Sequence, residues 1–180
     1  MSKIDFDEFI NNQIETKSDE NPIDWDTKLK EWLESLSQFY KKVENFLEEY
    51  VTDGKVKFQY ENKTIFEEYI GEYSVRVLNI ELAGRKLKLE PIGTNIIGAK
   101  GRIDLIGANG TVKFVLVNKN SSAPETKINI WIEGEEPTEK DDEPEVIEWD
   151  WKISTPPPRI RYINLEQETF LDALMEVMGG

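Results

Sequence analysis

The clearest pattern of apolar and polar positions lies over residues 24–51. Apolar side chains recur there at steps of three and four, the spacing that places them on one side of an α-helix. Asp24 or Asp26 is suited to begin such a helix, and Gly54 to follow its end in the left-handed conformation. The pattern predicts a helix roughly 39 Å long that covers one face of a sheet. A dimer seam is the alternative, and the absence of a strict heptad disfavours it.

Residues 55–163 contain several short runs in which apolar and polar positions alternate, separated by glycine and proline. A period of two is typical of strands with one buried face. We expect these runs to form a mostly antiparallel, twisted sheet of six to eight strands. The runs predicted as strands are 55–60, 73–82, 85–90, 101–105, 111–117, 127–133, 147–153 and 159–163.

Turn residues predict how some of these runs connect. Ala83-Gly84 and Asn109-Gly110 are typical of tight hairpins. Thr64 and Glu67 have the spacing of a capping box, so we expect a turn of helix that runs through Tyr69. Pro91 cannot donate a hydrogen bond in a sheet and is expected to end its strand.

The two ends of the chain each show a further helical pattern. Residues 1–22 predict a short amphipathic helix and a linker. Residues 165–178 predict a C-terminal helix, with Asn164 as its N-cap. Together these elements predict an α+β fold in which residues 1–180 form a single domain with the long helix on the sheet.

The composition excludes several kinds of chemistry. The chain has 180 residues with no cysteine and no histidine, so disulfides, thiol nucleophiles and imidazole bases are excluded. The remaining metal ligands are carboxylates, which suit only hard divalent cations. We expect no cofactor and no metal site, and the sequence favours a protein that is not an enzyme.

Two features of the sequence bear on where the protein works. No apolar run approaches the roughly 20 residues needed to span a bilayer. The first residues carry acids where a signal peptide needs a basic segment followed by an apolar one. We therefore expect a cytoplasmic protein with no membrane partner, and the sequence predicts no oligomeric state.

Charge is distributed unevenly along the chain. The net charge is −14, yet residues 84–119 carry +5 and residues 133–145 carry −7. The acidic stretch has two prolines and no apolar anchor, so we expect a mobile loop over 134–145 that binds a basic protein partner. The residues expected to contact this partner are Glu135, Glu136, Glu139, Asp141, Asp142 and Glu143.

Residues 93–101 resemble a phosphate-binding loop in their glycine spacing. The lysine comes one place late and a strand follows where a helix is needed, so nucleotide hydrolysis is not predicted. A simpler anion or small-ligand site stays open, because glycine backbone N–H groups would lie beside basic side chains. The residues expected in it are Gly98, Lys100, Gly101 and Arg102.

Gly101–Leu105 followed by Phe114–Lys119 resembles the core of PD-(D/E)XK nucleases. In that family an Asp on one strand and an acid-x-Lys on the next hold Mg²⁺ and orient water. The resemblance implies Asp104 and Lys119 as site residues of a degenerate nuclease-like fold. Val117 takes the place of the second acid.

Other interpretations of these basic and aromatic positions need no ligand. Asp104 is expected to pair with Arg102 or Lys113 on the solvent face. Binding of nucleic acid by the basic stretch is not favoured, because the chain as a whole is strongly negative. Trp149 and Trp151 share one face of a predicted strand, and both are expected in the core.

Three hypotheses for function therefore remain. The first, which we favour, is a non-catalytic protein-interaction module with an acidic surface, such as an inhibitor, immunity or adaptor protein. The second is the degenerate nuclease-like fold around Asp104 and Lys119. The third is an anion or small-ligand binder at the loop from Gly93 to Arg102.

Overall fold

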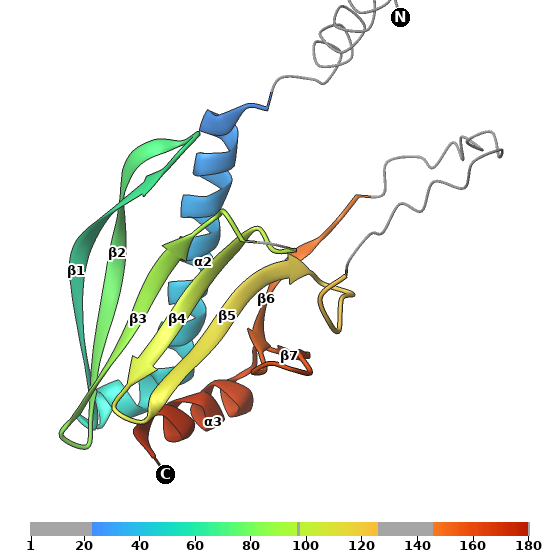
Figure 1. Cartoon of the computed structure of the whole chain (residues 1–180). Coiled ribbons are helices and arrows are strands. Elements are labelled where there is room, and N and C mark those ends of the chain that lie inside the picture. The colour runs from blue at the N-terminus through green and yellow to red at the C-terminus, as the bar shows by residue number, and fades with distance from the viewer. Residues whose placement is uncertain (1–22, 97, 126–145, 180) are drawn as a thin grey trace, which may run out of the picture.

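In a computed structural model, the chain is described over residues 23–96, 98–125 and 146–179. These residues form a seven-stranded antiparallel sheet, whose strands follow one another in chain order, and two helices (Figure 1). The predicted α+β fold, with a long helix over an antiparallel sheet, is confirmed. The expected helix in 1–22, the strand 127–133 and the loop 134–145 lie outside the described residues. The elements are α2 (Trp25–Thr52), β1 (Val56–Glu67), β2 (Gly71–Leu82), β3 (Arg85–Gly93), β4 (Gly101–Gly107), β5 (Gly110–Asn118), β6 (Trp149–Ser154), β7 (Tyr162–Asn164) and α3 (Gln167–Met178).

Helix α2 begins and ends where its sequence predicts. The Asp24 carboxylate accepts hydrogen bonds from the backbone N–H and the hydroxyl of Thr27, which satisfies a free donor of the first turn. Gly54 follows the helix at φ +72°, a conformation that costs glycine little. Neither helix in the described part of the chain is long and apolar enough to cross a bilayer. The stripe that α2 buries consists of Trp32, Leu36, Phe39, Tyr40, Val43 and Leu47.

Helix α3 packs on the same face of the sheet as α2. Phe170 lies with its ring centre 6.0 Å from that of Phe114 on β5 and 5.8 Å from that of Phe46 on α2. The N-cap is Glu166 rather than the expected Asn164, because Asn164 is held as the last residue of β7. The backbone N–H of Glu166 donates to the Thr169 hydroxyl at 3.0 Å, which closes the first turn.

The β4–β5 turn caps the other end of α3. Asn109 donates from its backbone N–H to the Val177 carbonyl at 2.9 Å and from its side chain to the Glu176 carbonyl at 3.1 Å. The turn residues are Ala108 and Asn109, and Gly110 already pairs in β5. The hairpin is therefore one residue earlier than expected, because its asparagine faces the free carbonyls of α3.

The predicted helical turn through Tyr69 is wrong. Strand β1 continues to Glu67 in unbroken register with β2, with Thr64 opposite Ser74. Ile65, opposite Tyr73, is buried, so the cross-strand apolar pair outweighs the capping-box pattern. Only three residues are left for the turn before β2.

Pro91 does not end its strand, contrary to prediction. It pairs with Ile103 of β4, and β3 runs on to Gly93 through a shift of register. The Lys63 ammonium lies 3.4 Å from the Pro91 carbonyl, which therefore points away from β4. The nitrogen of a strand residue points to the same side as its carbonyl, so the nitrogen of Pro91 also points away from β4. The missing N–H of proline therefore costs no hydrogen bond of the sheet.

Strands β2 and β3 pair over only part of their length. Their register covers Leu78–Leu82 against Arg85–Leu89, and beyond it the β1–β2 hairpin leaves the sheet (Figure 1). Side chains bridge the parting strands. The Tyr40 hydroxyl of α2 donates to the Arg76 carbonyl at 2.6 Å, and Lys63 pairs with Glu90 at 2.8 Å.

The Trp32 side chain of α2 packs directly on Gly101 of β4. A β-carbon at this position would lie 2.1 Å from a ring carbon of Trp32, which is far inside van der Waals contact. The Trp32 ring is 2% exposed, and its centre is 6.0 Å from that of Trp151. Glycine at position 101 thus sets how deeply the N-terminal half of α2 sits on the sheet.

We expect Gly101→Ala to lower the free energy of unfolding by about 1–3 kcal/mol, because the added methyl group overpacks the Trp32 contact. Urea unfolding followed by circular dichroism measures the loss. The matched test is the double variant Gly101→Ala with Trp32→Leu. It should lose less than the sum of the two single variants, since the smaller side chain makes room. Additive losses would contradict the proposed contact.

Candidate functional site

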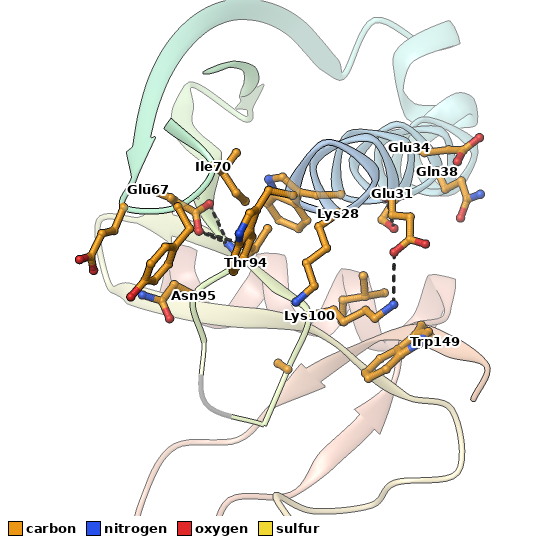
Figure 2. A pocket seen from close by; sticks show the side chains of 17 residues that line it. Lys28, Glu31, Glu34, Gln38, Glu67, Ile70, Thr94, Asn95, Lys100 and Trp149 are labelled. Atoms are coloured by element: carbon orange, nitrogen blue, oxygen red, sulfur yellow. Dashed lines mark hydrogen bonds and ion pairs between the residues drawn. The ribbon is translucent and has the colours of Figure 1, made fainter. Parts of the chain in front are cut away.

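A cavity of about 580 Å³ opens between α2 and the parting strands, and we call it the α2 groove. Its walls come from the N-terminal half of α2, the β1–β2 turn at 67–70, the β3–β4 segment at 94–100, and the beginning of β6 (Figure 2). It exists because α2 stays against the sheet at Trp32 while the β1–β2 hairpin turns away. Segments far apart in the sequence therefore meet around it.

One strip of α2 forms a long wall of the groove. Trp25, Lys28, Glu31, Ser35 and Gln38 recur at steps of three and four and line it together. The last of these residues is thirteen positions after the first, so the wall extends about 20 Å at 1.5 Å per residue. That length suits a small organic molecule or a short extended peptide.

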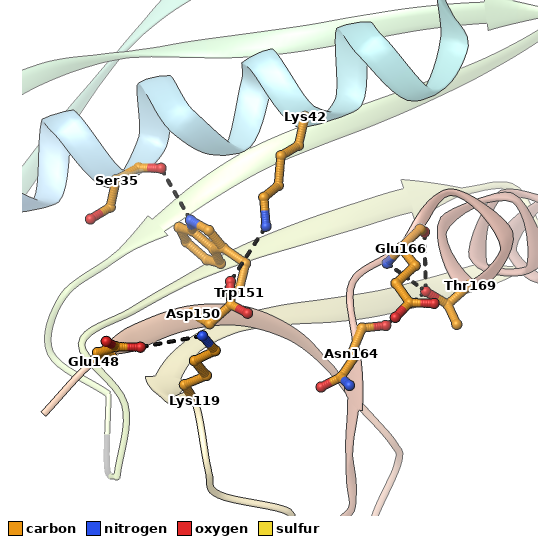
Figure 3. Close-up of polar contacts among 9 residues, drawn as sticks. All are labelled: Ser35, Lys42, Lys119, Glu148, Asp150, Trp151, Asn164, Glu166 and Thr169. Atoms are coloured by element: carbon orange, nitrogen blue, oxygen red, sulfur yellow. Dashed lines mark hydrogen bonds and ion pairs between the residues drawn. The ribbon is translucent and has the colours of Figure 1, made fainter.

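Aromatic rings stand at both ends of the groove. Trp25 stacks on Tyr69 of the β1–β2 turn, with ring centres 5.1 Å apart and planes at 11°. At the other end lies Trp149, which is 38% exposed, although both tryptophans of this strand were expected in the core. Only Trp151 is buried, with its indole N–H donating to the Ser35 carbonyl of α2 at 3.1 Å (Figure 3).

Two lysines point into the space between α2 and the β3–β4 segment (Figure 2). The Lys100 ammonium lies 4.5 Å from the ring centre of Trp149 and 3.4 Å from the Glu31 carboxylate. The Lys28 ammonium lies 5.0 Å from the ring centre of Trp25. Among the described residues, no carboxylate lies within ion-pair distance of Lys28. Within the part of the chain that the structure describes, the groove thus holds one lysine with a carboxylate partner and one without.

Glu67 ties the β1–β2 turn to the β3–β4 segment. Its carboxylate accepts hydrogen bonds from the Thr94 backbone N–H at 3.0 Å, from the Thr94 hydroxyl at 2.6 Å, and from the Tyr73 hydroxyl. Burial by itself raises the pKa of Glu67, but these hydrogen bonds outweigh it, and the pKa lies below its ordinary value. Burial and the same carboxylate raise the pKa of Tyr73. The hydrogen bonds of Glu67 therefore connect two segments at the rim of the groove, the β1–β2 turn and the β3–β4 segment.

Of the four residues expected in an anion site, only Lys100 lines the groove. Gly98 lies in an exposed turn at φ +75°, where glycine relieves the backbone. Gly101 is paired in β4 beneath Trp32. Arg102 forms a bidentate ion pair with Asp104, with both N···O distances at 2.7 Å. Gly98 therefore allows the backbone conformation of a turn, and Gly101 allows Trp32 of α2 to pack on β4.

The structure does not bring Asp104 and Lys119 together. Asp104 lies opposite Lys113 in the β4–β5 register, and Lys119 is six residues further along, about 20 Å in a strand. Lys119 pairs with Glu148 at 3.3 Å (Figure 3). Within the described residues, no three potential metal ligands gather. The PD-(D/E)XK arrangement thus lacks its lysine and its second acid.

The basic residues of 84–119 scatter over different parts of the fold. Arg85 donates to the Met178 carbonyl at the end of α3. Lys88 pairs with Glu90 at 3.2 Å. Lys100 is the member that reaches the α2 groove. The acids expected to contact a basic partner, Glu135 to Glu143, lie outside the described residues.

Comparison with protein family models, curated proteins and solved structures found no match to this chain. The function of the α2 groove is therefore argued from its own side chains. Sequence patterns did not identify Lys28 or Tyr69 as site residues. Lys28 is one of several lysines on the polar side of α2, and Tyr69 was assigned to a helical turn. Tyr69 could have been found, because placing it in a turn between two strands would have predicted an exposed aromatic ring, which is typical of interaction sites.

We expect Glu67→Gln to lower the free energy of unfolding by about 1–2 kcal/mol at neutral pH, because it removes a hydrogen-bonded carboxylate. The folded-state pKa is depressed, so the stabilisation is present above the ordinary value of 4.5 and is lost as the pH falls through the folded-state value. Urea unfolding should show a gap between variant and parent at about pH 7 that narrows as the pH falls below 4.5. The neighbouring exposed Glu68→Gln is the control and should show no such gap.

We expect Asp104→Asn to act on stability. The Asp104 side chain is 10% exposed, and its loss leaves Arg102 without a carboxylate partner, at a cost of about 1–3 kcal/mol. Thermal unfolding measures the cost, and calorimetric titration with Mn²⁺ should give the same heats for variant and parent. Mn²⁺ binding to the parent that disappears in the variant would instead support a metal site at Asp104.

Proposed function

We propose that the protein is a non-catalytic binding module that holds its ligand or partner in the α2 groove. The observation that carries the proposal is the exposure of aromatic rings around a cavity of about 580 Å³. Ligand sites are typically concave, walled by aromatic and apolar side chains, and provided with a few converging polar groups. The groove has these properties at one place.

The aromatic rings of the groove are not accounted for by the core. Tyr69 is 67% exposed and Trp149 is 38% exposed, although each belongs to a segment with a well-packed apolar neighbour. Exposed large apolar groups that cluster at a cavity are typical of interaction sites. Scattered single positions would carry no such meaning, but these two line the same groove.

The charged groups of the groove favour binding over reaction. Glu67 is held by Thr94 and Tyr73, and Glu31 by Lys100. A general acid or base has to exchange its proton with a substrate, and a carboxylate committed to such contacts is poorly placed to do so. The nuclease-like alternative needs Asp104 beside Lys119, and the register separates the two.

The favoured partner from sequence, a basic protein that contacts residues 135–143, stays a prediction. Those residues lie outside the part of the chain that the structure describes. The α2 groove and the acidic stretch are thus two separate interaction hypotheses. They are distinguished by the variants that abolish binding, since Trp149 belongs to the groove alone.

Binding of a neutral fluorescent probe, N-phenyl-naphthylamine, tests the groove in the full chain. We expect saturable binding that the double variant Tyr69→Ala with Trp149→Ala weakens at least about tenfold, since aromatic contact area is lost. Phe66→Ala is the control, because this ring is 75% exposed at the same hairpin but does not line the cavity. Equal loss in the control, or no loss in the double variant, would contradict the proposal.

A further inference from the structure

We infer that the ligand of the α2 groove carries an anionic group, bound by Lys28 and Lys100, on a planar apolar body that contacts the Trp149 ring. This inference rests on the proposed function and adds the chemical class of the ligand. A carboxylate, sulfonate or phosphate on an aromatic ring system has the required chemistry.

Lys28 and Lys100 are the cations that line the groove, together with four glutamates, Glu31, Glu34, Glu67 and Glu68. Lys28 points into the space beneath α2 (Figure 2), and among the described residues no carboxylate lies within ion-pair distance of its ammonium. Lys100 points into the same space from the opposite wall. An anion in this space would be attracted by both ammonium groups, and a charge-assisted hydrogen bond to either of them is favourable.

The glutamates of the groove do not offer an equivalent site for a cation. Glu67 accepts three hydrogen bonds from the protein, and Glu31 is paired with Lys100. Glu34 points outward at the far rim (Figure 2), and Glu68 is exposed in the β1–β2 turn. The carboxylates are thus either committed or directed to solvent.

The pairing of Lys100 with Glu31 is weak enough to be shared with a ligand. Its N···O distance is 3.4 Å, and the two side chains are 40% and 55% exposed. Exposed ion pairs contribute little to stability, so a ligand anion meets little resistance at Lys100. Removal of the Glu31 charge should therefore strengthen the binding of an anion, which a purely apolar groove would not show.

The aromatic rings define the shape of the rest of the ligand. Lys100 covers the Trp149 ring with its ammonium 4.5 Å from the ring centre. An anion at Lys100 consequently places an attached ring system next to Trp149. The Trp25–Tyr69 stack closes the other end, so a flat body of two or three rings fits the cavity of about 580 Å³.

A matched pair of probes tests the anionic group in the full chain. Anilinonaphthalene sulfonate and N-phenyl-naphthylamine have the same ring system, and only the first carries a sulfonate. We expect Lys28→Gln and Lys100→Gln each to weaken the sulfonate about fivefold and to leave the neutral probe unchanged. We expect Glu31→Gln to tighten the sulfonate and again to leave the neutral probe unchanged. Added salt should weaken only the sulfonate.

Control variants on the same helix separate local contact from general charge. Lys30→Gln and Glu48→Gln change exposed residues of α2 that do not line the groove, and both probes should bind them as they bind the parent. If the lysine variants weaken both probes equally, or neither, the anionic assignment is overturned while the groove stays a binding site. If Tyr69→Ala with Trp149→Ala affects neither probe, the proposed function fails as well.

Discussion

The contact between Trp32 and Gly101 is the constraint on which the rest of the structure depends. No side chain other than hydrogen fits at position 101, so the indole ring of Trp32 on α2 packs directly on β4. From there an aromatic cluster continues along the helix, with Phe39 5.2 Å from Phe114 and 5.0 Å from Trp151 between ring centres. Edge-on aromatic contacts of this kind add specificity to burial. They fix the position of the helix along the sheet as well as its distance.

Because α2 is fixed in this way, the β1–β2 hairpin cannot stay flat on the sheet along its whole length. It pairs with β3 only from Leu78 to Leu82 and then rises beside the N-terminal half of the helix. The polar contacts at Glu67 and Lys63 fasten the departing hairpin to the end of β3. The α2 groove is the space left between these three elements, so its shape follows from the fold and not from any one loop.

The long helix and the alternating strands could be predicted because their signals are local. The helix pattern over 24–51 and the turn at Ala83-Gly84 each depend on residues that are neighbours in the sequence. The predictions were wrong where pairing with a residue of another strand determined the local structure. Pairing of Ile65 with Tyr73 keeps β1 extended where a capping box predicted a helical turn. Pro91 stays within β3 because the side of the strand to which its nitrogen points has no partner there. The groove was only partly foreseen, through Lys100, because no local pattern places Lys28 beside the β3–β4 segment.

Contacts with distant partners also separate the residues that stabilise the fold from exposed residues that the fold does not require. Gly101, Trp151 and Arg102 were candidates for binding or core, and each has a structural partner that accounts for it: Trp32, Ser35 and Asp104. Trp149 and Lys28 have weaker contacts, because the Trp149 ring stays partly in water beside the Lys100 ammonium. The Lys28 ammonium lies near the Trp25 ring and has no carboxylate partner among the described residues. Two lysines reach this groove in a chain of net charge −14, where four glutamates also line it. An anionic ligand that contacts both lysines and an adjacent tryptophan gives these side chains a common physical reason.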